Sequence, residues 1–297
     1  MRKDIWMPAA ALAGGGAGFA LRRWQLTSAF QSESGLFARG APATAALLAL
    51  CGLVLAGLLL FLLQGEHRRP EDFLAAFGCP QSGQMAALAA GGLLLMLSGP
   101  FGLREGFARF SLLRSGLGSF SAAYPAATLL CALLCLPAGL GLLLLGQAAC
   151  RREVSAAAGH LASFPALAAL VWLFSTHLAH GSEPVLMRYG FTLAASGLLM
   201  LAHYGAAGFL FDKPMPRLTA FCGLSGAMLG LVSLADGPDL FTAAMTLALS
   251  LSALALVRVL LRGMFGPSWP KRLMGERMPP PETDQDTPPE SNTLTEG

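Results

Sequence analysis

Long apolar stretches alternate with short polar connections along the whole chain, and this pattern predicts membrane-spanning helices. A helix needs roughly 20 mostly apolar residues to cross the hydrocarbon core of a bilayer. Eight stretches have about this length: 5–21, 42–63, 84–103, 123–147, 163–180, 189–211, 218–235 and 240–261. We therefore predict an all-α fold, a polytopic transmembrane helix bundle of about eight spans.

The first stretch is the weakest of the eight because it is short and contains Gly14, Gly15 and Gly16. A basic start followed by an apolar run is also typical of a signal peptide. However, the stretch ends in Leu-Arg-Arg without a small-x-small cleavage site. We interpret it as a retained first helix that packs closely through its glycines, and the signal peptide is the alternative.

The distribution of Lys and Arg predicts the orientation, since these residues favour cytoplasmic loops. With eight spans, twelve basic residues fall on the side of both termini and seven on the opposite side. The last predicted external turn, residues 236–239, contains two acids and no base. We therefore predict that both termini are cytoplasmic, although the first and third loops run against the rule.

The composition agrees with a membrane protein and excludes nucleic-acid binding. The chain is 54% hydrophobic and 12% charged, against about 25% charged residues in soluble domains. Such a surface would be too apolar for water, so we expect much of it to face lipid. The net charge is only +3 and forms no basic stripe. The predicted partners are the lipid bilayer and either another membrane protein or a second copy of the chain.

Two domains are expected, a transmembrane helical domain over 1–262 and a cytoplasmic tail over 263–297. From about residue 278 the tail contains five prolines, five acids and no aromatic residue. A segment of this composition cannot bury enough apolar surface to offset its chain entropy. We therefore predict that it is disordered.

The third loop has an amphipathic pattern of its own. Apolar residues recur at helical spacing at Leu103, Phe107, Phe110, Leu113 and Leu117. This spacing predicts a short separate helix that lies at the membrane interface.

The first two helical hairpins resemble each other. Leu21-Arg22 ends the first predicted span and Leu103-Arg104 ends the third, while Pro42 opens the second span and Pro125 the fourth. The offsets of 82 and 83 residues suggest an internal repeat, as in many transporters. The alternative is a chance match between helices rich in Ala and Leu.

Four ionisable residues lie within the predicted spans: His177, His180, His203 and Arg258. Such residues are costly in lipid, so each is a candidate functional group. His177 and His180 share a helix face and could begin a metal site, but zinc requires three or four ligands. His203 is predicted to lie too deep in the membrane to be the third ligand. We therefore predict no metal site, no cofactor, and an Arg258 that extends its long side chain to water.

One pair of motifs indicates an alternative with catalytic chemistry. Gly223-Leu224-Ser225-Gly226 is similar to the Gly-x-Ser-Gly motif of rhomboid intramembrane proteases, and Ala202-His203-Tyr204-Gly205 is similar to their Ala-His-x-Gly. The resemblance implies Ser225 as a nucleophile with His203 as its base. The order is reversed, however, because rhomboids place the serine before the histidine. The alternative interpretation is a helix face of small residues for close packing.

A second resemblance covers about a tenth of the chain. The segment Leu21-Arg-Arg-Trp-Gln-Leu-Thr-Ser-Ala-Phe30, followed by Gly35-Leu36 and Gly40-Ala-Pro-Ala-Thr44, is similar to uncharacterised multi-spanning membrane proteins of anaerobic Gram-positive bacteria. That resemblance implies a multi-pass protein of a bacterial cell membrane and implies no activity.

Taken together, the residues favour a non-enzymatic membrane component, such as an accessory subunit, a scaffold or a permease-like protein. The expectation rests on the absence of Asp, Glu and Lys from the predicted spans, because ion-coupled carriers commonly use buried carboxylates. The alternative is an intramembrane serine hydrolase that uses Ser225 and His203.

Overall fold

The computed structural model describes residues 2–31, 36–64, 68–79, 82–118, 120–181 and 188–266. These residues are almost entirely helical, apart from a small antiparallel pair, β1 (Phe30–Gln31) and β2 (Leu36–Phe37). The long helices are α1 (Lys3–Ser28), α2 (Pro42–Leu63), α4 (Ser82–Arg114), α5 (Ala123–Arg151), α7 (Phe164–Ala179), α8 (Gly190–Gly208), α9 (Pro216–Ser233) and α10 (Leu240–Phe265). The short helices are α3 (Phe73–Phe77), α6 (Ala156–Leu161) and the 3-10 helix η2 (Leu234–Asp236).

The predicted all-α transmembrane bundle is confirmed. Within the described ranges, seven helices are long and apolar enough to cross a membrane: α2, α4, α5, α7 with α6, α8, α9 with η2, and α10. Helix α1 is not among the seven, although its 26 residues would extend about 39 Å at 1.5 Å per residue. Its glycines and charged residues make it the least apolar of the long helices, as the sequence indicated.

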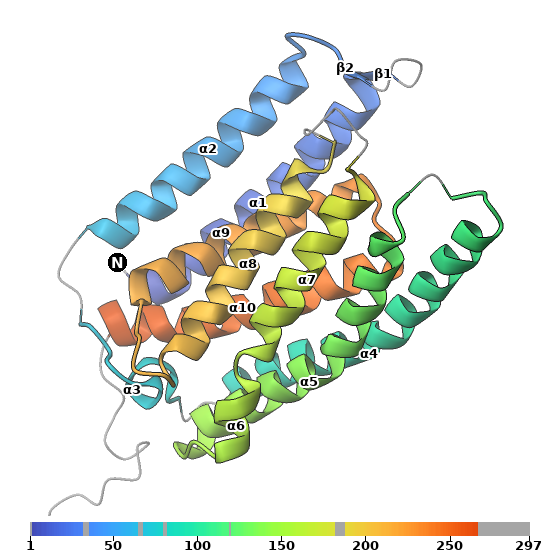
Figure 1. The fold of residues 1–297 in the computed structure, drawn as a ribbon. Coiled ribbons are helices and arrows are strands. Elements are labelled where there is room, and N and C mark those ends of the chain that lie inside the picture. Colours follow the sequence, from blue (N-terminus) through green and yellow to red (C-terminus); the bar gives the residue numbers. More distant parts are fainter. Residues whose placement is uncertain are drawn as a thin grey trace, which may run out of the picture. The chain divides into compact units, whose positions relative to one another are not determined.

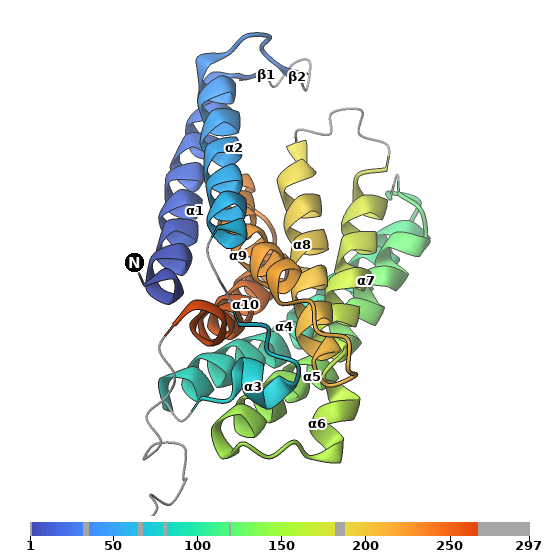
Figure 2. The same ribbon diagram turned by 90° about the vertical axis from the view of Figure 1, so that its left-hand side faces the viewer.

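Six of the long helices form a closed ring in which each packs against the next: α9, α8, α7, α5, α4, α10 and back to α9. Helix α1 packs outside this ring against α9 and α10, and α2 packs mainly on α1 (Figures 1 and 2). Burial follows this arrangement, since 78% of the α9 span is buried inside the protein and only 22% of the α2 span. Helix α2 therefore offers the most surface to lipid.

Both ends of the helical domain lie on one side of the bundle. The Lys3 ammonium donates to the carbonyl oxygens of Phe61 (2.7 Å) and Gln64 (2.6 Å), and it lies 4.1 Å from the centre of the Phe265 ring. This contact joins the start of α1 to the ends of α2 and α10. We call this side the terminal end, and the opposite side, where α1, α4, α7 and η2 end, the distal end.

The separate interfacial helix predicted for the third loop is wrong. Helix α4 continues without a break from Ser82 to Arg114. Its last part packs on α5, where a Cβ at Gly102 would lie 2.8 Å from the Ala132 Cβ and one at Gly106 would lie 2.6 Å from the Leu129 Cδ2. The contact with α5 is thus made by glycines of α4, while Phe107 and Leu117 of the apolar pattern stay exposed.

The close packing predicted for the glycines of the first span and for the small residues around Ser225 is present in the structure. A Cβ at Gly18 would lie 2.6 Å from the Val232 Cγ2, across the contact of α1 with α9. A Cβ at Gly226 would lie 3.0 Å from the Leu199 backbone nitrogen, across the contact of α9 with α8. Helix α9 is thus surrounded on several faces, which explains its high burial.

The boundary predicted at residue 262 falls inside the last turn of α10, which ends at Phe265. The compact helical unit extends to residue 267. The disorder predicted from about 278 lies outside the described residues. The proposed repeat of the α1–α2 and α4–α5 hairpins stays a prediction, although Pro42 and Pro125 both lie in the first turn of their helices.

Candidate functional site

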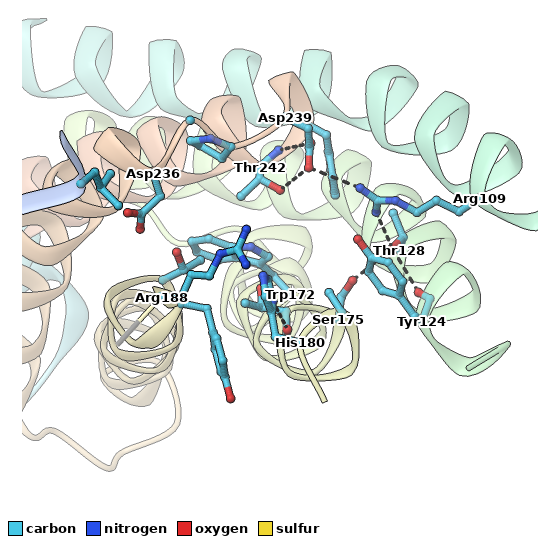
Figure 3. A pocket seen from close by; sticks show the side chains of 18 of the residues that line it. Arg109, Tyr124, Thr128, Trp172, Ser175, His180, Arg188, Asp236, Asp239 and Thr242 are labelled. Atoms are coloured by element: carbon cyan, nitrogen blue, oxygen red, sulfur yellow. Dashed lines mark hydrogen bonds and ion pairs between the residues drawn. The ribbon is translucent and has the colours of Figure 1, made fainter. Parts of the chain in front are cut away.

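A cavity of about 480 Å³ lies at the distal end of the six-helix ring (Figure 3). Residues of α4, α5, α7, α8, η2 and α10 line it, and Leu26 of α1 and Phe30 of β1 lie at its border. Pockets for small molecules usually measure about 300–1,000 Å³, so this volume suits a small ligand. The lining is unusually polar for a membrane bundle, and its charged groups come from several helices.

One wall of the cavity is organised around Arg109 of α4. Its guanidinium lies 2.9 Å from Glu105 Oε1 and 3.4 Å from Asp239 Oδ2, and it donates to Thr128 Oγ1 at 3.3 Å. The same group lies 4.6 Å from the centre of the Tyr124 ring, within the range of a cation–π interaction. These contacts join α4 to α5 and to the start of α10.

Asp239 is held in place by its role as the N-cap of α10. Its Oδ1 accepts from the Thr242 backbone N–H at 2.9 Å, and its Oδ2 accepts from the Thr242 hydroxyl at 3.1 Å. An aspartate at this position satisfies one of the free N–H groups at a helix start. The carboxylate is therefore fixed before any ligand arrives.

The opposite wall depends on Arg22, which is fully buried. Its Nε donates to Asp236 Oδ1 at 2.7 Å, its Nη1 to Gln25 Oε1 at 2.7 Å, and its Nη2 to the Arg188 carbonyl at 3.2 Å. Gln25 in turn donates to Thr44 Oγ1 at 2.9 Å. This network connects α1 and α2 with η2 and with the segment before α8, and it orients the Asp236 carboxylate.

Arg22 lies just beyond the predicted end of the first span, and that end was wrong because α1 continues to Ser28. The predicted span stopped at residue 21 since an Arg-Arg pair was taken to mark its end. The spacing of residues along α1 nevertheless indicates that the helix continues past residue 21. The buried positions of α1 recur every three or four residues, and the series Ala11, Gly14, Gly18 continues to Arg22 and Gln25.

Two polar atoms of the cavity residues are buried without a hydrogen-bond partner among the described residues. They are the indole Nε1 of Trp172 and the Oδ2 of Asp236. Trp172 is 2% exposed. Buried donors and acceptors are nearly always paired, and leaving one unpaired costs about 1–3 kcal/mol. Because both residues line the cavity, these two atoms are candidates to be paired by a bound molecule.

The two histidines considered as a metal pair point to different surroundings. His180 lines the cavity, where its Nδ1 lies 2.9 Å from the Thr176 carbonyl and its ring stacks on Tyr189 with a centroid distance of 4.7 Å. His177 is exposed and is not among the lining residues. In the part of the chain that the structure describes, no group of three or more His, Cys, Asp or Glu residues could hold a metal ion.

Ser225 and His203 are both buried in the middle of the bundle, but no hydrogen bond joins them. Both ring nitrogens of His203 have other partners: Nδ1 lies 2.8 Å from the Leu199 carbonyl and Nε2 lies 2.9 Å from Ser252 Oγ. The Ser225 hydroxyl is fully buried and has no partner among the described residues. The serine beside the histidine is therefore Ser252 of α10, which sequence reasoning did not consider because no motif surrounds it.

Comparison of the chain with protein-family models, curated proteins and solved structures gave no match. The functional argument therefore rests on the geometry of the site. The similarity to membrane proteins of anaerobic Gram-positive bacteria stays a prediction.

Proposed function

We propose that this integral membrane protein is a non-enzymatic component of a bacterial cell membrane that binds a small polar ligand in its distal cavity. It would act as a permease or as a ligand-binding accessory subunit. The observation that supports the proposal is the combination of a cavity of about 480 Å³ with a buried unpaired donor on Trp172 and a buried unpaired acceptor on Asp236.

The hydroxyl groups of the cavity favour binding over catalysis. A serine or threonine nucleophile needs an adjacent base. Here the hydroxyls of Thr128 and Ser175 hydrogen-bond to each other at 3.1 Å, and Thr128 also donates to the Tyr124 carbonyl. The nearby histidine, His180, is hydrogen-bonded to the backbone of its own helix. These groups hold the wall in place rather than activate a nucleophile.

The proposal is tested by thermal unfolding of the purified protein in mild detergent with separate pools of sugars, amino acids, carboxylic acids and amines. A ligand present at 100 times its dissociation constant stabilises the folded state by about 2.7 kcal/mol. We expect one pool to raise the melting temperature and expect Trp172→Phe to weaken the effect. Trp24→Phe is the matched control, because Trp24 is 45% exposed and is not among the lining residues.

A failure of every pool, or an equal response of both tryptophan variants, would overturn the proposal. Hydrolysis of peptides or esters that is lost on Ser225→Ala would instead support the hydrolase alternative. Uptake of the stabilising compound into vesicles containing the protein distinguishes a permease from a binding subunit.

A further inference from the structure

We infer that the distal cavity binds a small zwitterion with a primary ammonium group and a carboxylate, the chemistry of a free amino acid. The inference rests on the proposed function, because it names the class of ligand for the same cavity. It follows from the charge balance of the site, from the two unpaired polar atoms, and from the way in which Asp236 is held.

The charged groups at the cavity balance one another among the described residues. Arg109, Arg188, Asp236 and Asp239 line the cavity, while Arg22 is paired with Asp236 and Glu105 with Arg109. With His180 neutral, the sum is three positive and three negative charges. An ion of a single sign would disturb this balance, because it would enter without a counter-charge of its own. A ligand without net charge is therefore favoured.

One of the two unpaired atoms is a hydrogen-bond acceptor and the other is a donor, so each would bind a different end of such a ligand. The Oδ2 of Asp236 can only accept when the carboxyl is ionised, and the indole N–H of Trp172 can only donate. An ammonium group would donate to Asp236, and a carboxylate would accept from Trp172. Hydrogen bonds with an ionised partner are roughly twice as strong as those between neutral groups.

Asp236 is prepared for this role by its contact with Arg22. The buried guanidinium binds Oδ1 at 2.7 Å and leaves Oδ2 unpaired. Figure 3 shows Asp236 and Arg109 on opposite sides of the cavity. Each side of the cavity thus carries a carboxylate and a guanidinium, and the unpaired acceptor lies on the side of Asp236.

The aromatic lining limits the identity of the ammonium group. Trp172, Tyr124 and Tyr189 line the cavity, and their rings would also attract a quaternary ammonium by cation–π interaction. A quaternary ammonium carries no N–H, so it would leave Asp236 Oδ2 unpaired. A primary ammonium satisfies that atom, and the aromatic rings then surround the apolar part of the ligand.

The test measures binding of the common L-amino acids, one at a time, by thermal unfolding and titration calorimetry of the full-length protein in lipid nanodiscs. For each amino acid that binds, the matched amine without the carboxylate and the matched acid without the ammonium are measured as well. We expect at least one amino acid to bind. Each matched compound should bind at least about tenfold more weakly, because it lacks one hydrogen bond that involves a charged group.

Two variants locate the site. Asp236→Asn and Trp172→Phe should each weaken binding of the amino acid by about tenfold or more. Asp212→Asn is the matched control, because Asp212 is exposed, is absent from the cavity lining, and has a positive φ of 54° that asparagine also adopts. Unfolding without ligand shows whether each variant is folded, and Trp172→Phe tests the site even if Asp236→Asn is unstable.

The outcomes separate the two proposals. Binding of sugars, or of an acid or amine as tight as that of its amino acid, would overturn the zwitterion and leave the binding function intact. The absence of binding by every class of compound would overturn both. Binding of an amino acid that neither cavity variant weakens would place the ligand elsewhere and overturn the inference.

Discussion

Two buried polar sites among the described residues differ in whether their hydrogen-bonding groups are all paired. In the distal cavity, charged and aromatic side chains surround a volume of about 480 Å³, and a donor and an acceptor remain unpaired. In the middle of the bundle, both ring nitrogens of His203 have partners: Nδ1 donates to the Leu199 carbonyl, and Nε2 lies 2.9 Å from the Ser252 hydroxyl. His203 is 2% exposed and Ser252 fully buried, and neither lines the distal cavity.

The difference shows why burial of a polar residue is not by itself a sign of function. A buried histidine with both nitrogens paired stabilises the contact between α8 and α10 and needs nothing more. A buried tryptophan N–H without a partner, beside an open volume, is incomplete until a ligand or water reaches it. The unmet hydrogen-bonding capacity, together with space, marks the distal site as the one that binds.

The largest effect is expected for Arg22→Met, which would leave the Asp236 carboxylate without its buried partner. Breaking a buried ion pair on one side typically costs about 3–5 kcal/mol. We expect a clear fall in the melting temperature in detergent, together with loss of the ligand response.

Arg23→Met is the control for that prediction, because Arg23 is exposed and should change the free energy of unfolding by no more than about 0.5 kcal/mol. The double variant Arg22→Met with Asp236→Asn should recover part of the loss. If Arg22→Met and Arg23→Met were equally stable, the ion pair would not hold the distal wall together.

A smaller effect is expected for Ser252→Ala in the central site. The substitution leaves His203 Nε2 without its partner, and an unsatisfied buried group costs about 1–3 kcal/mol. Ser225→Ala removes a hydroxyl that has no partner among the described residues, so it should be nearly neutral.

Chemical denaturation of both serine variants checks this difference, and neither should alter ligand binding. A reduced affinity of Ser252→Ala for the ligand would contradict the view that the central site has no part in ligand binding. Equal destabilisation by both substitutions would mean that Ser225 has a polar role that its contacts do not reveal.

The smallest effects distinguish two carboxylates around Arg109. Asp239→Ala removes the N-cap of α10 and should lower stability by about 1 kcal/mol. Glu105 is 40% exposed and pairs with Arg109 within one helix, so Glu105→Ala should cost only about 0.3–0.5 kcal/mol.

Thermal unfolding with closely spaced temperature points checks this order, and ligand binding should weaken more for Asp239→Ala than for Glu105→Ala. The reverse order would show that the exposed pair within α4, rather than the fixed cap of α10, determines the position of Arg109.

Much of the fold was predictable because hydrophobic length is a local property. The span predicted for 42–63 coincides with α2, and the span predicted for 163–180 differs from α7 by one residue at each end. The glycine spacing of α9 likewise indicated close contacts. The first span was ended too early because charged residues were read as loop markers, although a partner on another helix allows an arginine inside a bundle.

The candidate site could be predicted only in part. Asp236 and Asp239 were noted as acids of one external turn, and His180 was noted as an ionisable residue near a helix end. No sequence motif indicated that these residues meet at one cavity, or that Trp172 and Arg109 line it as well. The Ser225 and His203 pair was selected by motif, and a motif does not specify the rotation of a helix about its axis.

The sequence by itself determined that this chain forms apolar helices, roughly where they begin and end, and which faces carry small residues for close packing. The tertiary structure alone decided which polar groups meet. Arg22 and Asp236 are 214 positions apart, and His203 and Ser252 are 49 apart. Helix formation depends on neighbours within a few residues, whereas these contacts depend on which helices adjoin and how each is rotated, which is set by the packing of the whole ring.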